Sequence, residues 1–262
     1  MKNTITQDKA VKILFDTETT GIEEEDKILQ IGAMIIDDCG NIEAHNYLCD
    51  PRVEIKIEAM ETHNITQDMI EGKPRYRNLP IRKRLNDFNN SSNFLIAHNI
   101  EFDMKMIEKE GFKNEYTLID TLRVARHLLP DSSYHRLQYL RYSLELYKDE
   151  ASLADRENIE IKAHDAIGDV LVMKLLLDRL EKMVLAKYPD KDPYTEMAYL
   201  TTLPVLIKKF KFGKYKDMLL SDVCQNDKGY IKWMRNNMDL DEDLEFSLAY
   251  FMGEIPSEQC SF

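Results

Sequence analysis

The sequence of 262 residues predicts an α/β fold, a β-sheet flanked by helices, followed by a small C-terminal module. Three β-rich runs come first, and shorter apolar runs then alternate with segments of helical periodicity. A charged stretch with two prolines, Lys187–Pro193, separates these elements from an aromatic-rich tail. Because the chain exceeds the usual single-domain size, we expect a main domain at 1–186, a linker region at 187–203 and the module at 204–262.

The first elements are strands at Val11–Phe15, Ile28–Ile36 and Ile42–Leu48, where apolar and β-branched residues dominate. The segment Asp37–Asn41 is rich in turn residues. We therefore expect the strands on either side of it to pair in an antiparallel meander.

Helices and short strands alternate in the middle of the chain. A short helix through Met69 and Ile70 is expected to be capped by Thr66. The long helix Asp165–Val184 has the most regular apolar stripe. Gly111 is expected to end the helix Glu101–Glu110. The elements predicted after Thr66 are helix Leu79–Phe88, strand Phe94–Ala97, helix Glu101–Glu110, strand Thr117–Ile119, helices around Thr121–His127 and Arg136–Leu146, a charged loop Lys148–Glu160, and helix Asp165–Val184.

The charge balance limits the kinds of partner. A net charge of −12 disfavours tight, sequence-reading binding of duplex DNA, because phosphate binding is driven by positive charge. Two stretches, 72–86 and 204–216, nevertheless carry lysines or arginines and no acid. An acidic enzyme that contacts a nucleic-acid polymer briefly, near one end of that polymer, therefore remains compatible with the sequence.

The sequence also indicates a compartment. No apolar run approaches the roughly 18–20 residues that a membrane span needs, and the first residues lack the apolar core of a signal peptide. The four cysteines have no C-x-x-C spacing, which argues against a zinc site and indicates reduced thiols. We expect a cytoplasmic protein without a membrane partner.

Carboxylates follow three separate apolar or helical segments. Asp16 and Glu18 end the first strand, and side chains two apart on a strand point the same way. Such close like charges repel unless a cation lies between them. Asp103 follows a similar apolar strand with a polar end, and Asp169 lies at the opening of a helix together with His164. Four hard oxygen ligands select Mg²⁺ or Mn²⁺ over zinc or copper, and two such ions can grip a phosphodiester between them.

Three motifs carry a family resemblance. They are Phe15–Gly21 (FDTETTG), Ala97–Asp103 (AHNIEFD) and His164–Asp169 (HDAIGD). In order, spacing and context, the stretch from about Val11 to Leu180 resembles the DEDDh-type 3′→5′ exonucleases (DnaQ-like) of the ribonuclease H-like superfamily. The resemblance implies a mixed β-sheet flanked by helices.

The resemblance also assigns roles. It implies that Asp16, Glu18, Asp103 and Asp169 bind two ions of Mg²⁺ or Mn²⁺ and that His164 is the general base. A histidine beside a carboxylate cluster independently suits proton transfer near neutral pH. The neighbouring Asp165 does not fit the motif spacing, and a negative charge at a helix N-terminus is sufficient reason for it.

Further residues could contact the terminal nucleotide, as the family implies. These are Thr17, Thr19, Thr20, His63, His98 and Asn99. Turn and capping chemistry explains most of them equally well. His63 opens a loop that resembles a His-Gly-Ile-Thr loop of the family, and Asn64 replaces the glycine there. Asparagine also tolerates the left-handed conformation, so the loop need not change.

The C-terminal stretches Phe210–Lys216 and Gly229–Trp233 look like the small module that follows the nuclease domain in exodeoxyribonuclease X-like proteins. Aromatic residues interleaved with lysines suit a nucleic-acid single strand, whose bases stack on rings while lysines follow its backbone. A glycine-centred turn with core aromatics is the competing explanation.

We therefore expect a metal-dependent 3′→5′ exonuclease that hydrolyses terminal phosphodiesters of DNA, with single-stranded ends favoured, to nucleoside 5′-monophosphates by a two-metal mechanism. The alternatives are a proofreading subunit of a replicative polymerase, an RNA-trimming exoribonuclease and a catalytically silent nucleic-acid-binding protein. The tail Gln259–Phe262 faintly resembles a sliding-clamp-binding peptide, so a polymerase or clamp partner stays open. The complete set of four acids and a histidine argues against the silent protein.

Overall fold

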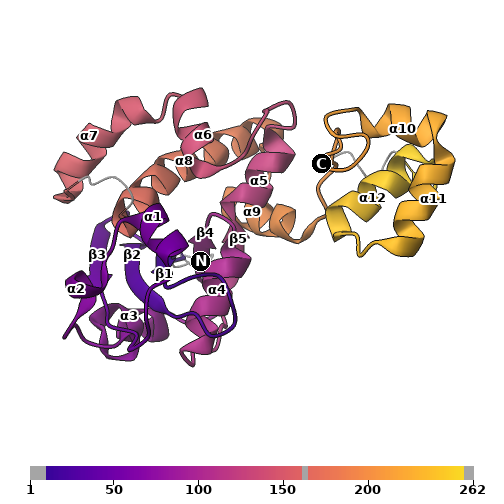
Figure 1. Cartoon of the computed structure of the whole chain (residues 1–262). Coiled ribbons are helices and arrows are strands. Elements are labelled where there is room, and N and C mark those ends of the chain that lie inside the picture. Colours follow the sequence, from indigo (N-terminus) through magenta and orange to yellow (C-terminus); the bar gives the residue numbers. More distant parts are fainter. Residues whose placement is uncertain (1–9, 161–164, 257–262) are drawn as a thin grey trace, which may run out of the picture. The chain divides into compact units, whose positions relative to one another are not determined.

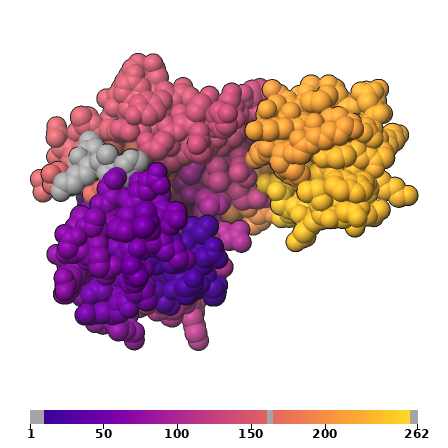
Figure 2. All heavy atoms as spheres, in the orientation of Figure 1, coloured from indigo at the N-terminus to yellow at the C-terminus, as the bar shows by residue number. Residues whose placement is uncertain are grey.

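The computed structural model describes residues 10–160 and 165–256. His164 and the tail Gln259–Phe262 lie outside the described residues. The chain divides into two compact units, and Figure 2 shows the C-terminal stretch of the second unit in orange and yellow. The units are Met1–Val124 with Ser133–Thr201, and Ala125–Ser132 with Thr202–Phe262.

The first unit is built on a five-stranded sheet with the order β3-β2-β1-β4-β5 (Figure 1). The strands are β1 Lys12–Thr19, β2 Ile28–Ile36, β3 Ile42–Leu48, β4 Phe94–Ala97 and β5 Thr117–Asp120. The pairs β1–β2 and β2–β3 are antiparallel, whereas β1–β4 and β4–β5 are parallel. The predicted meander and the mixed sheet are both confirmed.

The helices follow in chain order. They are α1 Ile57–His63, α2 Gln67–Ile70, the 3-10 helix η1 Tyr76–Asn78, α3 Pro80–Asp87, α4 Ile100–Lys109, α5 Thr121–Leu128, α6 Leu137–Ser143, α7 Tyr147–Glu157, α8 Ala166–Lys187, α9 Pro193–Thr202, α10 Leu220–Asn226, α11 Lys228–Asn237 and α12 Glu242–Phe251. The last three belong to the C-terminal unit.

The two faces of β1 pack against different helices. Ile13 and Phe15 belong to a core cluster with apolar residues of α3 and α4. Side chains alternate along a strand, so Asp16 and Glu18 point to the opposite face. Helix α8 covers that face of β1 and β2, and its predicted stripe of Ala166, Val170, Met173 and Leu177 is buried. The sheet therefore presents its two carboxylates to the start of α8.

Three segments differ from the sequence prediction. The predicted loop Lys148–Glu160 is wrong, because most of it forms α7. Only Glu150, Leu153 and Ala154 of that helix are buried. Most of its residues are exposed and many are charged, so the segment resembles a loop in sequence although it contains strong helix formers. Helix α1 was not predicted, and α9 fills most of the expected linker region 187–203.

Two loop predictions depend on backbone conformation. Thr66 is the N-cap residue of α2, but its hydroxyl donates to the Asp68 carboxylate (2.5 Å) and makes no capping bond to the backbone. Asn64 has a φ of 58°, so asparagine adopts the left-handed conformation after His63 as expected. Gly111, after α4, also has a positive φ.

The C-terminal unit has its own small core. Phe210, Leu220, Ile231 and Leu248 are buried there with four further apolar side chains from α10–α12. Within the part of the chain that the structure describes, no helix is both long and apolar enough to cross a membrane.

Candidate active site

Asp16 and Glu18 lie near the end of β1 on the face that α8 covers. Their partners across the antiparallel pair are Gly32 and Gln30. The intervening Thr17 is buried, whereas both carboxylates are partly exposed. This alternation confirms that the two carboxylates share one face of the strand.

Gly32 allows α8 to approach the sheet. A Cβ atom at this position would lie 2.4 Å from the Ile167 amide nitrogen and 2.5 Å from the Ala166 carbonyl carbon. No side chain fits into that gap without moving the backbone. The first turn of α8, which carries Asp169, is thereby held against β2, where Gly32 is the cross-strand partner of Asp16.

The three carboxylates meet as this packing requires. One oxygen from each of Asp16, Glu18 and Asp169 lies within 4.8 Å of the others. Carboxylate oxygens at this separation can ligate one hard divalent cation. The chemistry of the donor set therefore fits the metal that the sequence predicts.

Asp103 reaches the same region from the first turn of α4. It is buried, and its Oδ1 accepts hydrogen bonds from the Thr17 backbone N–H (3.0 Å) and hydroxyl (2.6 Å). Its helix begins after Asn99, which has a φ of 76° and whose N–H donates to Asp120 Oδ1 (2.9 Å). The carboxylate is thus fixed directly to the strand that carries Asp16.

Burial and neighbouring negative charges raise the pKa values of the carboxylates in the cluster. Burial, followed by the charges of Asp169 and Asp103, raises the pKa of Glu18 to about 8. Burial also raises the pKa of Asp103 to about 7, although the hydrogen bonds from Thr17 oppose this. The pKa of Asp16 is raised by burial and then by Asp103, Glu18 and Asp169. A bound cation would instead lower the pKa values of these carboxylates, because it stabilises their ionised forms.

Asp165 anchors α8 instead of joining the cluster. Its carboxylate accepts hydrogen bonds from the side-chain amides of Gln30 and of Asn46, the latter at 2.9 Å to Oδ2. We expected helix N-terminal charge complementarity to explain this residue. It is the N-cap residue of α8, yet its side chain makes no capping bond and instead ties the helix to β2 and β3.

The three threonines of the first motif all use their hydroxyls internally. Thr17 donates to Asp103, Thr19 to the Gly21 carbonyl (2.7 Å) and Thr20 to Asp26 Oδ1 (2.8 Å). All three threonines are buried. Their side chains therefore shape the strand end and its loop.

The two histidines predicted as substrate contacts differ in exposure. His63 is buried, with Nε2 3.2 Å from the Thr19 carbonyl oxygen and Nδ1 accepting from the Ile65 N–H. His98 is partly buried, and its Nε2 lies 2.8 Å from the His135 carbonyl oxygen. The neighbouring Asn99 is exposed.

Gln138, on α6, was missed by the sequence reasoning. Its amide nitrogen donates to Asp169 Oδ1 (2.7 Å). Its own oxygen accepts from Arg141 (3.3 Å), and that guanidinium pairs bidentately with the buried Glu150 (2.5 Å for each bond). A glutamine three residues before an arginine is a common spacing on any helix. The sequence therefore gives no sign that Gln138, Arg141 and Glu150 are linked to Asp169.

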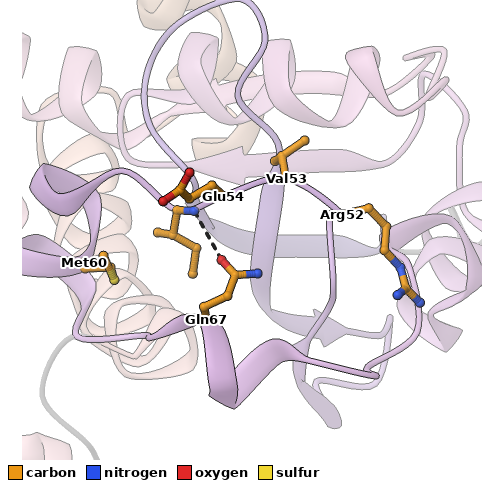
Figure 3. A pocket seen from close by; sticks show the side chains of 6 residues that line it. Arg52, Val53, Glu54, Met60 and Gln67 are labelled. Carbon is orange, nitrogen blue, oxygen red and sulfur yellow. Dashed lines mark hydrogen bonds between the residues drawn. The ribbon is translucent and has the colours of Figure 1, made fainter.

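A cavity of about 450 Å³ lies apart from these carboxylates, beside α1 and α2. Figure 3 shows Arg52, Val53, Glu54, Met60 and Gln67 around it, with the Gln67 side chain accepting from the Ile55 N–H (3.3 Å). None of the acids of the cluster lines it. The carboxylate cluster, and not this cavity, is the candidate active site.

Comparisons with known proteins identify two family models that match this chain. An exonuclease family model matches residues 13–177, and an exodeoxyribonuclease X-like C-terminal model matches residues 210–239. The chain is 27% identical over 240 residues to exodeoxyribonuclease 10 of Escherichia coli (strain K12), covering 91% of this chain and 97% of that protein. It is 33% identical over 136 residues to the DNA polymerase III subunit epsilon of Treponema pallidum (strain Nichols), covering 48% of this chain and 61% of that protein.

A solved structure also shares the fold. It is described as exonuclease X in complex with 5′ overhanging duplex DNA, and the match has a TM-score of 0.51 at 23% identity over 72% of this chain and 99% of that one. The expected divalent-metal dependence fits the family and the acidic cluster. The family model covers more than half of the chain, so the protein belongs to the exonuclease family and is a 3′→5′ exonuclease.

Proposed function

We propose that the protein removes nucleotides from DNA 3′ ends, prefers single-stranded ends and releases nucleoside 5′-monophosphates. The observation that carries the proposal is the meeting of Asp16, Glu18 and Asp169 within 4.8 Å on the α8 face of β1. Burial, followed by the charges of the neighbouring carboxylates, raises the pKa values of Asp16 and Glu18, and Asp103 is one of those neighbours. Such a cluster serves no stabilising purpose without a cation.

The proposed cofactor is Mg²⁺ or Mn²⁺, with two ions per site. Asp16, Glu18, Asp103 and Asp169 would hold them, because hard oxygen ligands suit these ions. When bound, the ions would lower the pKa of the attacking water and would stabilise the negative charge that develops on the leaving oxygen.

The chain's own residues complete the reaction. We assign to His164 the removal of a proton from the attacking water, since an imidazole titrates near neutral pH. Water then adds to phosphorus in line with the leaving 3′-oxygen, which takes up a proton as the terminal nucleotide departs as a 5′-monophosphate. Thr17 keeps Asp103 in place during this step through its two hydrogen bonds.

The proposed substrate contacts follow from exposure. We assign contact with sugar or phosphate to the exposed Asn99. His98 is assigned a role in positioning the loop around Asn99, because its Nδ1 lies 2.9 Å from Thr121 Oγ1 and its Nε2 lies 2.8 Å from the His135 carbonyl oxygen. Thr17, Thr19, Thr20 and His63 act by shaping the loop around the terminal nucleotide, since their polar side-chain atoms bond within the protein.

The share of this chain that each relative matches favours a stand-alone enzyme over a polymerase subunit. The exodeoxyribonuclease 10 match spans 91% of this chain, whereas the epsilon match spans 48%. A pull-down with polymerase or sliding clamp tests the second candidate, a proofreading partner. Capture of the polymerase by the purified protein at physiological salt would favour it.

Digestion of labelled oligonucleotides tests the proposal. A single-stranded DNA carrying a 3′ label, a copy with a 5′ label and an RNA copy are incubated with Mg²⁺, with Mn²⁺ and with EDTA. We expect immediate metal-dependent release of mononucleotide from the 3′ label, a shortening ladder from the 5′ label and slower digestion of RNA. A faster rate on RNA would assign the enzyme to RNA trimming.

The matched variant is Asp16→Ala, which we expect to be folded and inactive. Equal turnover in this variant would contradict the assignment of the site. Absence of release from a folded wild-type protein that still binds the strand would instead indicate a silent binding protein.

A further inference from the structure

The C-terminal unit exposes aromatic side chains beside lysines. Trp233 on α11 is 52% exposed and Phe212 is 39% exposed, whereas the nearby Phe210 is buried in the core of the unit. The sequence reasoning left open whether these aromatics are core or surface residues. The structure separates them, with Phe210 in the core and the other two at the surface.

The two segments that carry the exposed rings are packed together. Trp233 stacks on Tyr230 with ring centroids 5.8 Å apart, and the Lys214 ammonium lies 5.9 Å from the Tyr230 ring centroid. Gly213, between Phe212 and Lys214, lies so close to Tyr230 that an added Cβ would be 2.8 Å from its hydroxyl. The loop that carries Phe212 and Lys214 is therefore packed onto the residue that supports Trp233.

Hydrogen bonds hold this loop against α11. Asp227 accepts from the Tyr215 hydroxyl (2.6 Å), from the Tyr230 N–H (3.0 Å) and from Lys214 (3.4 Å). These bonds lower the pKa of Asp227, so it stays ionised near neutral pH. Binding to such a fixed surface loses little conformational freedom.

The segments that carry these rings are rich in lysine. Between Pro204 and Lys216 there are five lysines and no acid, and all five lysines are exposed. Helix α11, which carries Trp233, adds the exposed Lys228 and Lys232. Lys214 remains 64% exposed although it pairs with Asp227, and an exposed ion pair of this kind is weak. The lysines can therefore contact phosphates.

The pattern fits a nucleic-acid single strand better than the other partners. A duplex hides the faces of its bases, so exposed rings would gain nothing from it by stacking. A protein partner would need a contiguous apolar patch, whereas here Lys211 precedes Phe212 and Lys232 precedes Trp233. A single strand offers base faces and phosphates in alternation.

We propose that Phe212, Lys214 and Trp233 form an accessory binding surface for single-stranded DNA on the C-terminal unit. Bases stack on Trp233 and Phe212 while the lysines contact the backbone. This surface is distinct from the carboxylate cluster, and the choice of DNA as the strand rests on the proposed function.

The single tryptophan of the chain provides the measurement. The full chain carrying Asp16→Asn is titrated in EDTA with a thymidine oligonucleotide while Trp233 fluorescence is followed, so that no strand is cut. We expect saturable quenching that weakens as salt rises, because lysines release counterions from the strand. Inorganic polyphosphate should give no quenching, since it has charge without bases.

Two variants and two controls sharpen the test. We expect Trp233→Ala to weaken binding of a fluorescently labelled oligonucleotide about ten-fold, and Lys214→Ala to weaken it less and to reduce its salt dependence. Tyr199→Ala and Lys148→Ala change residues of similar exposure in the first unit and should leave affinity unchanged. Circular dichroism of each variant confirms the fold.

The outcomes separate this inference from the proposed function. Unchanged fluorescence with every oligonucleotide, from a wild-type protein that still digests DNA, would overturn the accessory surface and leave the exonuclease assignment intact. Equal quenching by polyphosphate would also overturn it. Quenching by the oligonucleotide in a protein without nuclease activity would support the surface although the proposed function failed.

Discussion

Gly32 and Asp16 are partners across the β1–β2 pair, and the space above Gly32 is filled by the backbone of Ala166 and Ile167. The absence of a side chain on β2 therefore sets the distance between the sheet and α8. Because Asp16 comes from the sheet and Asp169 from the helix, this contact also sets the separation of two proposed metal ligands.

Replacing Gly32 with alanine should damage both the fold and the site. The added Cβ would lie 2.4 Å from the Ile167 nitrogen, so α8 has to move away from the sheet. Overpacking of this kind costs about 1–3 kcal/mol in the free energy of unfolding. We also expect weaker Mn²⁺ binding, measured by calorimetry, because Asp169 moves with the helix.

The matched control is Gly229→Ala on α11. An added Cβ there meets its nearest atom at 3.5 Å, an ordinary contact distance, so stability should change little. If Gly32→Ala unfolded at the wild-type denaturant concentration and bound Mn²⁺ normally, the close approach of α8 would not matter to the site.

Much of the fold could be predicted because its strands are strongly patterned. Predicted strands Ile28–Ile36, Ile42–Leu48 and Phe94–Ala97 have the same bounds in the structure. Helix α7 could not be predicted in this way, since it buries only a few residues and therefore has no regular apolar stripe in the sequence. Helix α1 is similar, with His63 as its only buried residue.

The carboxylates of the site could also be predicted, but their supports could not. Local spacing places Asp16 and Glu18 on one face of a strand without knowledge of the fold. The bond from Thr17 to Asp103 joins residues 86 positions apart, and that from Gln138 to Asp169 joins residues 31 apart. Only the packing of α4 and α6 brings such pairs together.

Thr17→Val should weaken the hold on Asp103. The variant keeps the backbone N–H bond but removes the hydroxyl bond of 2.6 Å, which lowers the pKa of Asp103. The pKa should therefore rise further, and metal affinity should fall about ten-fold, as is common when a partner of a ligand is removed. Calorimetry with Mn²⁺ measures this.

Thr17→Ser, which keeps the hydroxyl, should restore most of that affinity. The control Thr19→Val removes a buried hydroxyl that donates to the Gly21 carbonyl and not to a carboxylate. Equal losses of affinity in Thr17→Val and Thr19→Val would show that both act only through stability.

Gln138 should act as a positioning residue for Asp169. Gln138→Leu removes the amide that donates to Asp169 Oδ1, so the carboxylate loses one of the contacts that orient it. We expect about ten-fold weaker Mn²⁺ binding and a lower kcat with little change in KM for the oligonucleotide. Arg141→Lys, which loses the bidentate pair with Glu150, should give a smaller effect in the same direction.

The control for this change is Gln67→Leu, an exposed glutamine at the cavity beside α2, which should bind Mn²⁺ normally. Tighter Mn²⁺ binding by Gln138→Leu would contradict the positioning role. It would show that the amide competes with the metal for Oδ1.

The carboxylate cluster should make the metal-free protein less stable as pH rises. Burial, followed by the charges of Asp169 and Asp103, raises the pKa of Glu18 to about 8, and burial raises that of Asp103 to about 7, whereas both would have values near 4 in the unfolded chain. Between these values the folded state binds more protons than the unfolded state, so the free energy of unfolding falls with rising pH. This contribution is fully present below about pH 4 and is lost as pH passes about 7 to 8.

Thermal unfolding in EDTA and in Mg²⁺ between about pH 6 and 9 measures this effect, with Glu18→Gln as the matched variant. Other groups titrate in this range, so the informative quantity is the difference in Tm between wild type and Glu18→Gln. In EDTA the wild type should lose stability relative to the variant as pH rises, because only the wild type must ionise Glu18. In Mg²⁺ the order should reverse, since the cation favours the ionised carboxylate. A difference in Tm that stays constant with pH in EDTA would show that Glu18 is already ionised without metal.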